Sequence, residues 1–414
     1  MGTGTLPQRR DCTDHPSAGV ALKILHAVEM YDPITGGAQE VVRQISTRLV
    51  RRGHDVTVVT SAGKVARPAL IDGVRIREFA VRGNGARGLT GDVVAYRDFV
   101  MRGDFDIVML YAAQQWSMDA LLPVLGQLSS CTVVAPCGFS GLGRDEWRSY
   151  FEALPGPLRL ADRIVCHSST YQDAVWLDRH GLAFEVIPNG ADEERFGGVP
   201  TRGLRAALGI DEGAPLVLLV GGQTGLKGHT EAMRVFLDAS ATEGGVLVLN
   251  GNHPARVGCG VSCAIRSRVH NLRHRDRRII LANLGRRELV CAYFEADLLL
   301  STSRVECSPL VLFEAAAAGL PFVASNAGNS AEIADWTGCG RVVDWPRGPS
   351  VKEGFPVDQF AREVDALLRD PAQRESMGAA GRQSWSHNFT WDHVVDQYER
   401  LYKGAVAARS ERQA

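Results

Sequence analysis

The sequence predicts an α/β protein with two doubly wound, Rossmann-like domains that face a cleft. The chain has 414 residues, which suffices for two domains with separate hydrophobic cores. In both halves, short apolar runs typical of buried parallel strands alternate with segments of helical periodicity. Open parallel sheets bind ligands beyond the carboxyl ends of their strands, so the cleft between two such sheets is the expected site.

The first half opens with a β-α-β unit. An apolar strand is expected at residues 22–28, then a turn at Gly36 and Gly37, a helix with an apolar face over residues 41–50, and a strand at 55–60. The crossover between the two parallel strands is right-handed in nearly all such units. Further strands of this half are expected at residues 106–110, 131–135, 163–166 and 185–187.

The second half has the same architecture but shows no internal sequence repeat. Residues 192–201 contain glycine and proline and are the expected linker between the domains. Residues 384–407 have the pattern of one helix. The strands of this half are expected at residues 216–220, 246–250, 279–281, 297–301 and 322–325.

The composition limits the classes of function. The 46 Lys and Arg residues nearly balance the 47 Asp and Glu residues, so no global field favours nucleic acid. No apolar run reaches the roughly 18–20 residues of a membrane span, and the first twenty residues lack the apolar middle of a signal peptide. We therefore expect a cytoplasmic protein. No G-x-G-x-x-G segment is present, which leaves a dinucleotide-dependent oxidoreductase without support.

Nine cysteines are scattered along the chain and are expected to be reduced thiols, most of them buried. Cys259, Cys263, His270 and His274 follow a C-x3-C-x6-H-x3-H spacing that loosely resembles a zinc site. The alternative is two thiols packed under a basic helix. Because the central spacer is shorter than that of zinc fingers, metal binding by these four residues stays open.

A helix with a clear start and end is expected after the strand at 297–301. Ser308 can cap it, and Pro309 suits its first position because the missing N–H would be unpaired there anyway. Gly319 and Pro321 end it. The amides of the next two residues, Leu310 and Val311, then point out of the helix start, where the dipole favours an anion.

Two carboxylates flank this phosphate-sized nest. Glu306 lies in the loop before the helix, and Glu314 lies early in the helix itself. Acids on either side of a nest suit a ligand that carries hydroxyls on either side of a diphosphate. A nucleotide sugar has this composition.

Glu306 and Glu314, separated by seven residues, resemble the E-x7-E signature of retaining glycosyltransferases of the GT-B fold, family 4 type. Three further motifs match in the same order, and the resemblance extends from about residue 22 to about residue 402. These motifs are Gly36-Gly37-Ala38-Gln39, Ile187-Pro188-Asn189-Gly190 and Lys227-Gly228.

The resemblance implies how the domains are used. The expected boundaries are disorder over residues 1–20, an acceptor-binding domain over 21–195, a nucleotide-sugar-binding domain over 203–385, and a final helix over 386–414 that crosses back to the first domain. It also implies transfer of a sugar from a nucleotide diphosphate to an acceptor hydroxyl with retained configuration. The nucleotide sugar is then a co-substrate, and neither a cofactor nor a metal is expected.

The resemblance also assigns roles to donor-site residues. Lys227 would bind the diphosphate and stabilise the departing charge, Glu306 would hold a sugar hydroxyl, and Glu314 would accept from the ribose. Gly36 and Gly37 would let backbone amides approach the distal phosphate or the acceptor. Each residue has an alternative interpretation without a donor. Lys227 would then be a surface lysine, Glu306 a solvated acid in a loop, and Glu314 an acid placed favourably near a helix start. The two glycines would form only a flexible turn.

The sequence departs from the family pattern at two positions. Gly222 stands where an arginine is usual, and Cys137 stands where a histidine is usually directed at the donor sugar. A lost charged hydrogen bond is worth about 1.5–3 kcal/mol, so Gln223, Thr224 or His229 is expected to share the task of the missing arginine. Cysteine cannot supply the hydrogen bonding of imidazole, which puts a catalytic use of position 137 in doubt.

The acceptor site is expected in loops of the first domain. Gln114 and Gln115 offer amides beside the aromatic face of Trp116, and Cys137 and Gly138 lie in a second loop. The alternative is a loop that packs on the core. The acceptor itself is open among glycans, lipid-linked sugars and small molecules, nucleic acid is not expected, and a peripheral membrane contact stays open. A nucleotide-sugar epimerase or hydrolase and a catalytically silent binding protein are the alternative functions.

Overall fold

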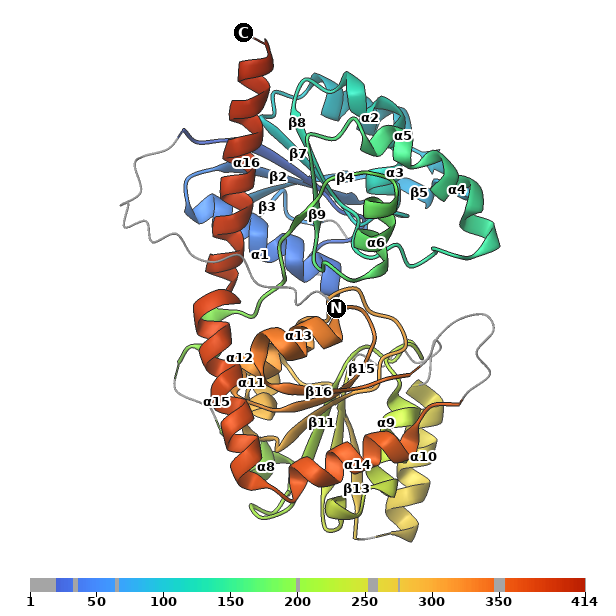
Figure 1. The fold of residues 1–414 in the computed structure, drawn as a ribbon, viewed down its shortest axis with the longest axis vertical. Coiled ribbons are helices and arrows are strands. Elements are labelled where there is room, and N and C mark those ends of the chain that lie inside the picture. Colours follow the sequence, from blue (N-terminus) through green and yellow to red (C-terminus); the bar gives the residue numbers. More distant parts are fainter. Residues whose placement is uncertain are drawn as a thin grey trace. The chain divides into compact units, whose positions relative to one another are not determined.

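The computed structural model describes residues 20–32, 36–63, 67–198, 202–251, 260–274, 276–345 and 354–413. The chain forms two compact α/β units (Figure 1). Unit 1 ends at Pro188 and resumes at Val395, and unit 2 covers Asn189–Val394. The predicted class of two doubly wound domains is therefore confirmed.

Unit 1 is built on an eight-stranded sheet with the order β10-β9-β8-β7-β1-β2-β4-β3, counted over the described residues. All pairs are parallel except β3 with β4. Ile24 of β1 lies opposite Val56 of β2 and Ile107 of β7. The sheet strands are β1 (Lys23–Ala27), β2 (Asp55–Ser61), β3 (Leu70–Ile71), β4 (Val74–Phe79), β7 (Ile107–Tyr111), β8 (Cys131–Ala135), β9 (Arg163–Cys166) and β10 (Glu185–Val186).

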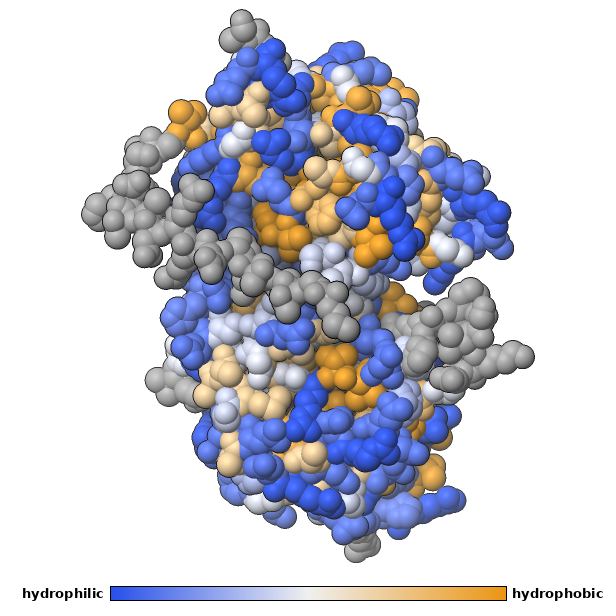
Figure 2. Space-filling model, in the orientation of Figure 1, coloured by the Kyte–Doolittle hydropathy of each residue, from blue (hydrophilic) through white to orange (hydrophobic). Residues whose placement is uncertain are grey.

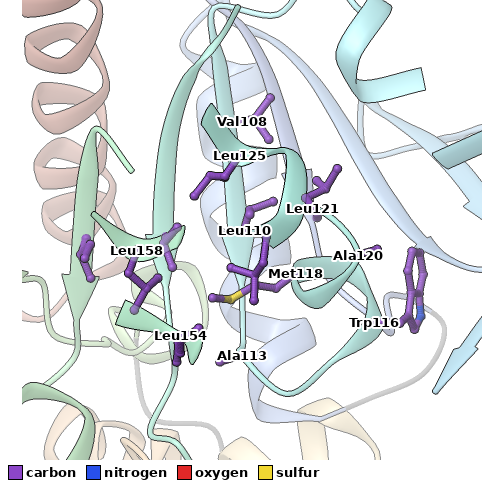
Figure 3. Packing of buried hydrophobic residues seen from close by; sticks show 14 of the residues in the cluster. Val108, Leu110, Ala113, Trp116, Met118, Ala120, Leu121, Leu125, Leu154 and Leu158 are labelled. Atoms are coloured by element: carbon purple, nitrogen blue, oxygen red, sulfur yellow. The ribbon is translucent and has the colours of Figure 1, made fainter. Parts of the chain in front are cut away.

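A separate antiparallel pair and several helices complete unit 1. The pair is β5 (Val81–Asn84) and β6 (Gly88–Gly91). The helices are α1 (Gly37–Arg51), α2 (Val93–Arg102), α3 (Trp116–Asp119), α4 (Arg148–Ala153), α5 (Pro155–Leu158) and α6 (Gln172–Arg179), with 3-10 turns at Leu122–Gln127 and Asp145–Trp147. Figure 3 shows the core on one side of the sheet, where Val108 and Leu110 of β7 meet Met118, Leu121 and Leu125.

Unit 2 is built on a parallel sheet with the order β13-β12-β11-β14-β15-β16 in the part of the chain that the structure describes. Its strands are β11 (Leu216–Val220), β12 (Val246–Asn250), β13 (Arg278–Ala282), β14 (Leu298–Ser301), β15 (Phe322–Ser325) and β16 (Gly340–Val343). Its helices are α7 (Glu193–Phe196), α8 (Leu204–Leu208), α9 (His229–Asp238), α10 (Gly260–Arg273), α11 (Arg286–Glu295), α12 (Leu310–Ala318), α13 (Ser330–Thr337), α14 (Val357–Leu368) and α15 (Pro371–Asn388), with a 3-10 turn at Ser240–Thr242.

The structure contains strands that the sequence did not predict: β3 to β6 and β16. β4 lies next to the short edge strand β3, and its exposed Arg75 and Arg77 interrupt the continuous apolar run that is typical of a central strand. β5 and β6 approach so closely that a Cβ on Gly83 would lie 2.0 Å from the carbonyl oxygen of Gly88. Glycines required by such contacts resemble a loop in sequence.

The expected linker at residues 192–201 is wrong in position. The described part of this segment belongs to unit 2, where Asp192 caps α7 by accepting from the amide of Glu194 at 3.1 Å. Ala191 donates to the carbonyl of Phe389 at 2.9 Å and pairs with Thr390. These local bonds hold the segment against unit 2, so the division falls earlier, after Pro188.

The single helix expected over residues 384–407 is two helices, α15 and α16 (Trp391–Gln413). The interruption lies at Phe389 and Thr390: the Phe389 carbonyl accepts from the amide of Ala191, and Thr390 forms a bridge with Ala191. α16 starts in unit 2 and continues as part of unit 1. There the hydroxyl of Tyr402 bonds to Nε2 of His26 at 3.0 Å, and Arg52 pairs with Glu399 at 2.9 Å. Among the described residues, no helix is long and apolar enough to cross a membrane.

Candidate active site

The two catalytic candidates follow the two strands at which the winding of the unit 2 sheet reverses. The chain moves outward in one direction through β11, β12 and β13, and in the other through β14, β15 and β16. Lys227 lies in the loop after β11, and Glu306 lies in the loop after β14. Ligands of doubly wound sheets bind at this switch point, beyond the carboxyl ends of the strands.

The two loops are locked together at Gly228. Its φ of 68° is in the left-handed region, and a Cβ there would lie 1.9 Å from the carbonyl oxygen of Thr302. The Thr302 hydroxyl in turn donates to the Gly228 carbonyl at 2.8 Å. Lys227 folds back over Gly221, where an added Cβ would lie 2.9 Å from the lysine Cγ. Two glycines thus set the path of the lysine side chain.

Lys227 and Glu306 form an ion pair. Nζ of Lys227 lies 2.5 Å from Oε1 of Glu306, and the two side chains are 31% and 12% exposed. The structure therefore brings together the two residues expected to be catalytic, although their direct contact was not predicted. A half-buried ammonium with one carboxylate partner retains donors for a second anion.

The start of α12 differs from the expectation. Pro309 is the N-cap, and Leu310 is the first helical residue, so Ser308 does not cap the helix. The extended backbone of Pro309, with ψ of 112°, keeps it outside the first turn. Leu310 and Val311 are the first two helical residues, whose amides have no carbonyl partner within the helix. The Ser308 hydroxyl is buried, and within the described ranges it has no hydrogen-bond partner.

Glu314 has a partner that the sequence did not reveal. The hydroxyl of Tyr293 on α11 donates to Oε2 of Glu314 at 2.7 Å. Burial, and next the adjacent Glu314, raise the pKa of Tyr293 well above its usual value. Tyr293 therefore stays protonated and fixes the orientation of the carboxylate. A tyrosine among the apolar residues of a helix carries no signal of this role in sequence.

Gln223 is the most unusual residue in the loop after β11. Its side chain is 0% exposed, and neither Oε1 nor Nε2 has a hydrogen-bond partner among the residues that the structure describes. Buried polar groups in native proteins are almost always paired, so a doubly unpaired amide indicates a group that a ligand satisfies. The neighbouring Gly222 offers no side chain, and Thr224 is exposed.

In unit 1 the winding reverses between β1 and β7, and the expected acceptor loops follow β7 and β8. Four residues in these loops adopt a left-handed φ although they are not glycine. Only one other non-glycine residue of the described chain, Asp72, does so. Such strain concentrates at functional sites. The four residues are Ala112, Gln114, Cys137 and Phe139, with φ of 68°, 66°, 56° and 48°.

The structure places the predicted acceptor-binding residues in different environments. Trp116 is 0% exposed and donates from its indole to Ser61 at 2.8 Å, so the expected sugar platform is wrong for this residue, which packs in the core. The amide of Gly138 is taken by Asp173 at 2.8 Å. Gln114 and Gln115 remain partly exposed, and Nε2 of Gln114 has no hydrogen-bond partner in the described part of the chain.

A buried acid supports the strained loop and was missed from sequence. Asp119 accepts from the amide of Gln114 at 3.2 Å, from the Tyr150 hydroxyl at 2.7 Å and from the amide of Gly85 at 2.7 Å. Burial raises the pKa of Asp119 to about 6. Burial and then the nearby Asp119 also raise the pKa of Glu29, in the loop after β1. The carboxylate thus ties the turn between β5 and β6, the loop after β7 and helix α4 together.

Gly36 and Gly37 lie at the start of α1. Gly36 is the N-cap in an extended conformation with φ of −177°, and both glycines are exposed. An added Cβ on Gly37 would meet no atom within 4 Å. An added Cβ on Gly36 would instead lie 2.5 Å from Oε1 of Gln39. The described residues therefore leave open space for an anion beside Gly37, whereas the Gln39 side chain lies against Gly36.

Two family models match almost the whole length over which the motifs extend. The model for glycosyl transferases group 1 matches residues 201–384, and the model for glycosyltransferase family 4 matches residues 35–195. The chain belongs to the group 1, family 4 glycosyltransferases. It is therefore a glycosyltransferase with the GT-B fold, as the motifs predicted.

Individual relatives agree with this assignment. The D-inositol 3-phosphate glycosyltransferase of Xylanimonas cellulosilytica is 26% identical, covering 95% of this chain and 98% of the relative. The GDP-mannose-dependent α-(1-6)-phosphatidylinositol monomannoside mannosyltransferase of Mycobacterium tuberculosis is also 26% identical, over 94% of this chain and all of the relative. The solved sucrose-phosphate synthase of Thermosynechococcus elongatus has a TM-score of 0.74 at 21% identity, over 94% of this chain and all of that chain.

The possible zinc cluster of this glycosyltransferase is only partly described, because Cys259 lies outside the described residues. Cys263 is buried, and the rings of His270 and His274 stack at 4.8 Å. His270 bonds through Nε2 to the carbonyl of Arg277 at 3.1 Å. Within the described ranges, no three His, Cys, Asp or Glu side chains are grouped to hold a metal.

Proposed function

We propose that this glycosyltransferase moves a sugar from a nucleotide diphosphate to an acceptor hydroxyl, retains the anomeric configuration, and needs no metal. The observation that carries the proposal is the Lys227–Glu306 pair at the switch point of unit 2, at 2.5 Å. A cation that neutralises diphosphate and a carboxylate that binds a hydroxyl are what a nucleotide sugar requires side by side.

The diphosphate would take the place of Glu306 as the partner of Lys227. The amides of Leu310 and Val311 at the start of α12, and the unpartnered Ser308 hydroxyl, would bind its oxygens. Gln223 would supply a hydrogen bond that Gly222, lacking a side chain, cannot give. Glu314, oriented by Tyr293, would accept from the ribose hydroxyls.

The step needs no nucleophile from the protein. The bond between the anomeric carbon and the diphosphate oxygen breaks, and the acceptor oxygen bonds to the same face of that carbon. The acceptor proton passes to the departing diphosphate oxygen. Preorganised donors of this kind are each worth about 10²–10³ in rate, so Lys227 and the helix start can supply the charge stabilisation that a metal gives elsewhere.

The acceptor would bind at the strained loops of unit 1, where Gln114 and Gln115 offer amides and Asp119 holds the loop. The names of the relatives, an inositol phosphate glycosyltransferase and a phosphatidylinositol monomannoside mannosyltransferase, make inositol-bearing acceptors the first to try. GDP-mannose, named for the latter, is the first donor to try alongside UDP-sugars.

The test is release of nucleotide from candidate nucleotide sugars with and without acceptors. Release that depends on acceptor, resists a chelator and yields a product with the donor's anomeric configuration by NMR supports the proposal. Sugar interconversion or hydrolysis without acceptor points instead to an epimerase or hydrolase. Saturable binding without product points to a silent binding protein, in which Gly222 and Cys137 have removed turnover.

Variants connect the activity to the site. Lys227→Met is expected to lower kcat/KM by about 10²–10³-fold, since it removes one preorganised charge. Lys403→Met is the matched control, because Lys403 also pairs with a glutamate, Glu399, at 2.6 Å but lies on α16. Equal activity of the two variants would remove Lys227 from the mechanism.

A further inference from the structure

Helix α10 exposes an apolar stripe. Val261, Ile265, Val269 and Leu272 are 57%, 58%, 42% and 83% exposed. They are spaced by four, four and three residues, so at 3.6 residues per turn they fall within about 80° of one side of the helix. Of the thirteen large apolar side chains that stand exposed in the described part of the chain, four lie on this helix.

The opposite side of α10 is anchored to unit 2. Cys263 and Ser267 are buried. The side chain of Asn271 exchanges two hydrogen bonds with the backbone of Ile279 in β13, at 2.9 and 3.0 Å. This anchor satisfies the edge strand and fixes the rotation of the helix, so the apolar stripe cannot turn inward. In Figure 2 orange atoms lie among blue ones along the edge where Figure 1 places α10.

Basic side chains accompany the stripe. Arg266, Arg268 and Arg273 are exposed, and α10 contains no acidic residue. By helical geometry, Arg268 falls on one flank of the stripe and Arg266 with Arg273 on the other. An apolar stripe between two cationic flanks is the pattern of a helix that lies in the interface of a membrane.

We propose that α10 binds peripherally to an anionic lipid surface. The apolar stripe would enter the boundary between headgroups and acyl chains, to a depth of about 5–10 Å, and the arginines would contact lipid phosphates. A second copy of the chain fits less well, because paired α10 helices would bring two sets of three arginines together without an acid between them. This proposal does not depend on the reaction that the site catalyses.

The test is co-sedimentation of the full chain with vesicles of phosphatidylcholine, with and without phosphatidylglycerol. Binding to the anionic vesicles is expected, and salt should weaken it. One arginine near such a surface contributes roughly fivefold in affinity, so the triple variant Arg266→Gln, Arg268→Gln and Arg273→Gln should bind about 100-fold more weakly. The double variant Ile265→Gln and Leu272→Gln should also lose binding, through the apolar contact.

The matched control changes two equally exposed apolar residues of unit 1. Leu70 and Val94 are 60% and 71% exposed, and Leu70→Gln with Val94→Gln should leave vesicle binding unchanged. All substituted side chains are exposed, so melting temperatures should stay the same. Absence of binding to anionic vesicles, equal loss in the control, or a dimer in sedimentation that Leu272→Gln dissociates would overturn the proposal.

Discussion

Replacing Gln223 by methionine should stabilise the ligand-free protein and weaken its donor binding. Gln223 is fully buried, and its two amide atoms are unpaired among the described residues; methionine has a similar length without these polar atoms. Each buried, unpaired polar atom costs about 1–3 kcal/mol, so the free energy of unfolding should rise by about 2–6 kcal/mol. At about 2–4 °C per kcal/mol for a domain of this size, even the lower value raises Tm by about 4–8 °C.

The same change should raise the Kd for the nucleotide diphosphate. A hydrogen bond to a charged phosphate is worth about 1.5–3 kcal/mol, which corresponds to a loss of about 10–150-fold in affinity. Thermal unfolding of the ligand-free protein and calorimetric titration with UDP and GDP measure the two effects separately. Their opposite signs are expected because the amide is unsatisfied until the ligand binds.

Gln44 provides the matched control. It is also buried, but its Nε2 donates to Glu40 at 2.7 Å and its Oε1 accepts from Arg48. Gln44→Met breaks bonds that already exist and should lower the free energy of unfolding by about 1–3 kcal/mol. A Gln223→Met variant that melts lower and binds nucleotide as well as the parent would refute the reasoning.

Three further predictions concern other parts of the chain. Tyr293→Phe should weaken donor binding about fivefold in the same titration, because it removes a hydrogen bond of about 1 kcal/mol that orients the ribose-binding carboxylate; unchanged binding would separate Tyr293 from the site. Burial lowers the pKa of His26 to about 3, so the folded state binds fewer protons than the unfolded state once the pH falls below about 6.5. Urea denaturation should therefore show that the free energy of unfolding falls by about 2 kcal/mol between pH 7 and pH 5. A His26→Gln variant should lack this loss. Gly378→Ala places a methyl group 2.2 Å from the carbonyl oxygen of Gly319 and should destabilise by about 1–3 kcal/mol. Gly404→Ala meets no atom within 4 Å inside α16 and should instead stabilise by about 0.5–1 kcal/mol, so equal effects of the two glycine variants would contradict the packing argument.

The sequence predicts central strands well because burial on both faces leaves a continuous apolar run. β11 and β12 have the expected bounds, and β14 starts one residue late. Two of the four edge strands, β3 and β16, are missed, whereas β10 and β13 were predicted. The glycine-rich hairpin of β5 and β6 is also missed, since its residues satisfy partners that only the folded chain brings near. The predicted N-cap of α12 is wrong by one residue: Ser308 was expected, but the extended backbone of Pro309 makes Pro309 the N-cap.

In the candidate site too, residues with a local sequence motif could be predicted, and residues that act through distant partners could not. Lys227 and Glu306 could be predicted from motifs, because their chemistry requires them at fixed distances from glycines and a helix start. Trp116 could not be assigned, since an aromatic residue beside amides suits a ligand platform and a hydrophobic core equally. Tyr293 and Asp119 act through side chains from distant segments, and nothing in their own neighbourhood in the sequence indicates such partners.

The return of α16 to unit 1 has a consequence for synthesis on the ribosome. Tyr398 and Tyr402 are fully buried, and Tyr402 meets His26, yet these tyrosines emerge only after all of residues 189–394. At about 5–20 residues per second, translation of that stretch takes on the order of 10–40 s. During this delay unit 1 lacks α16, so the buried residues that Tyr402 meets in the complete chain, His26 and Met109, are left uncovered on that side and open to chaperones and proteases. A premature stop near the end of the message would therefore damage the lobe that was made first.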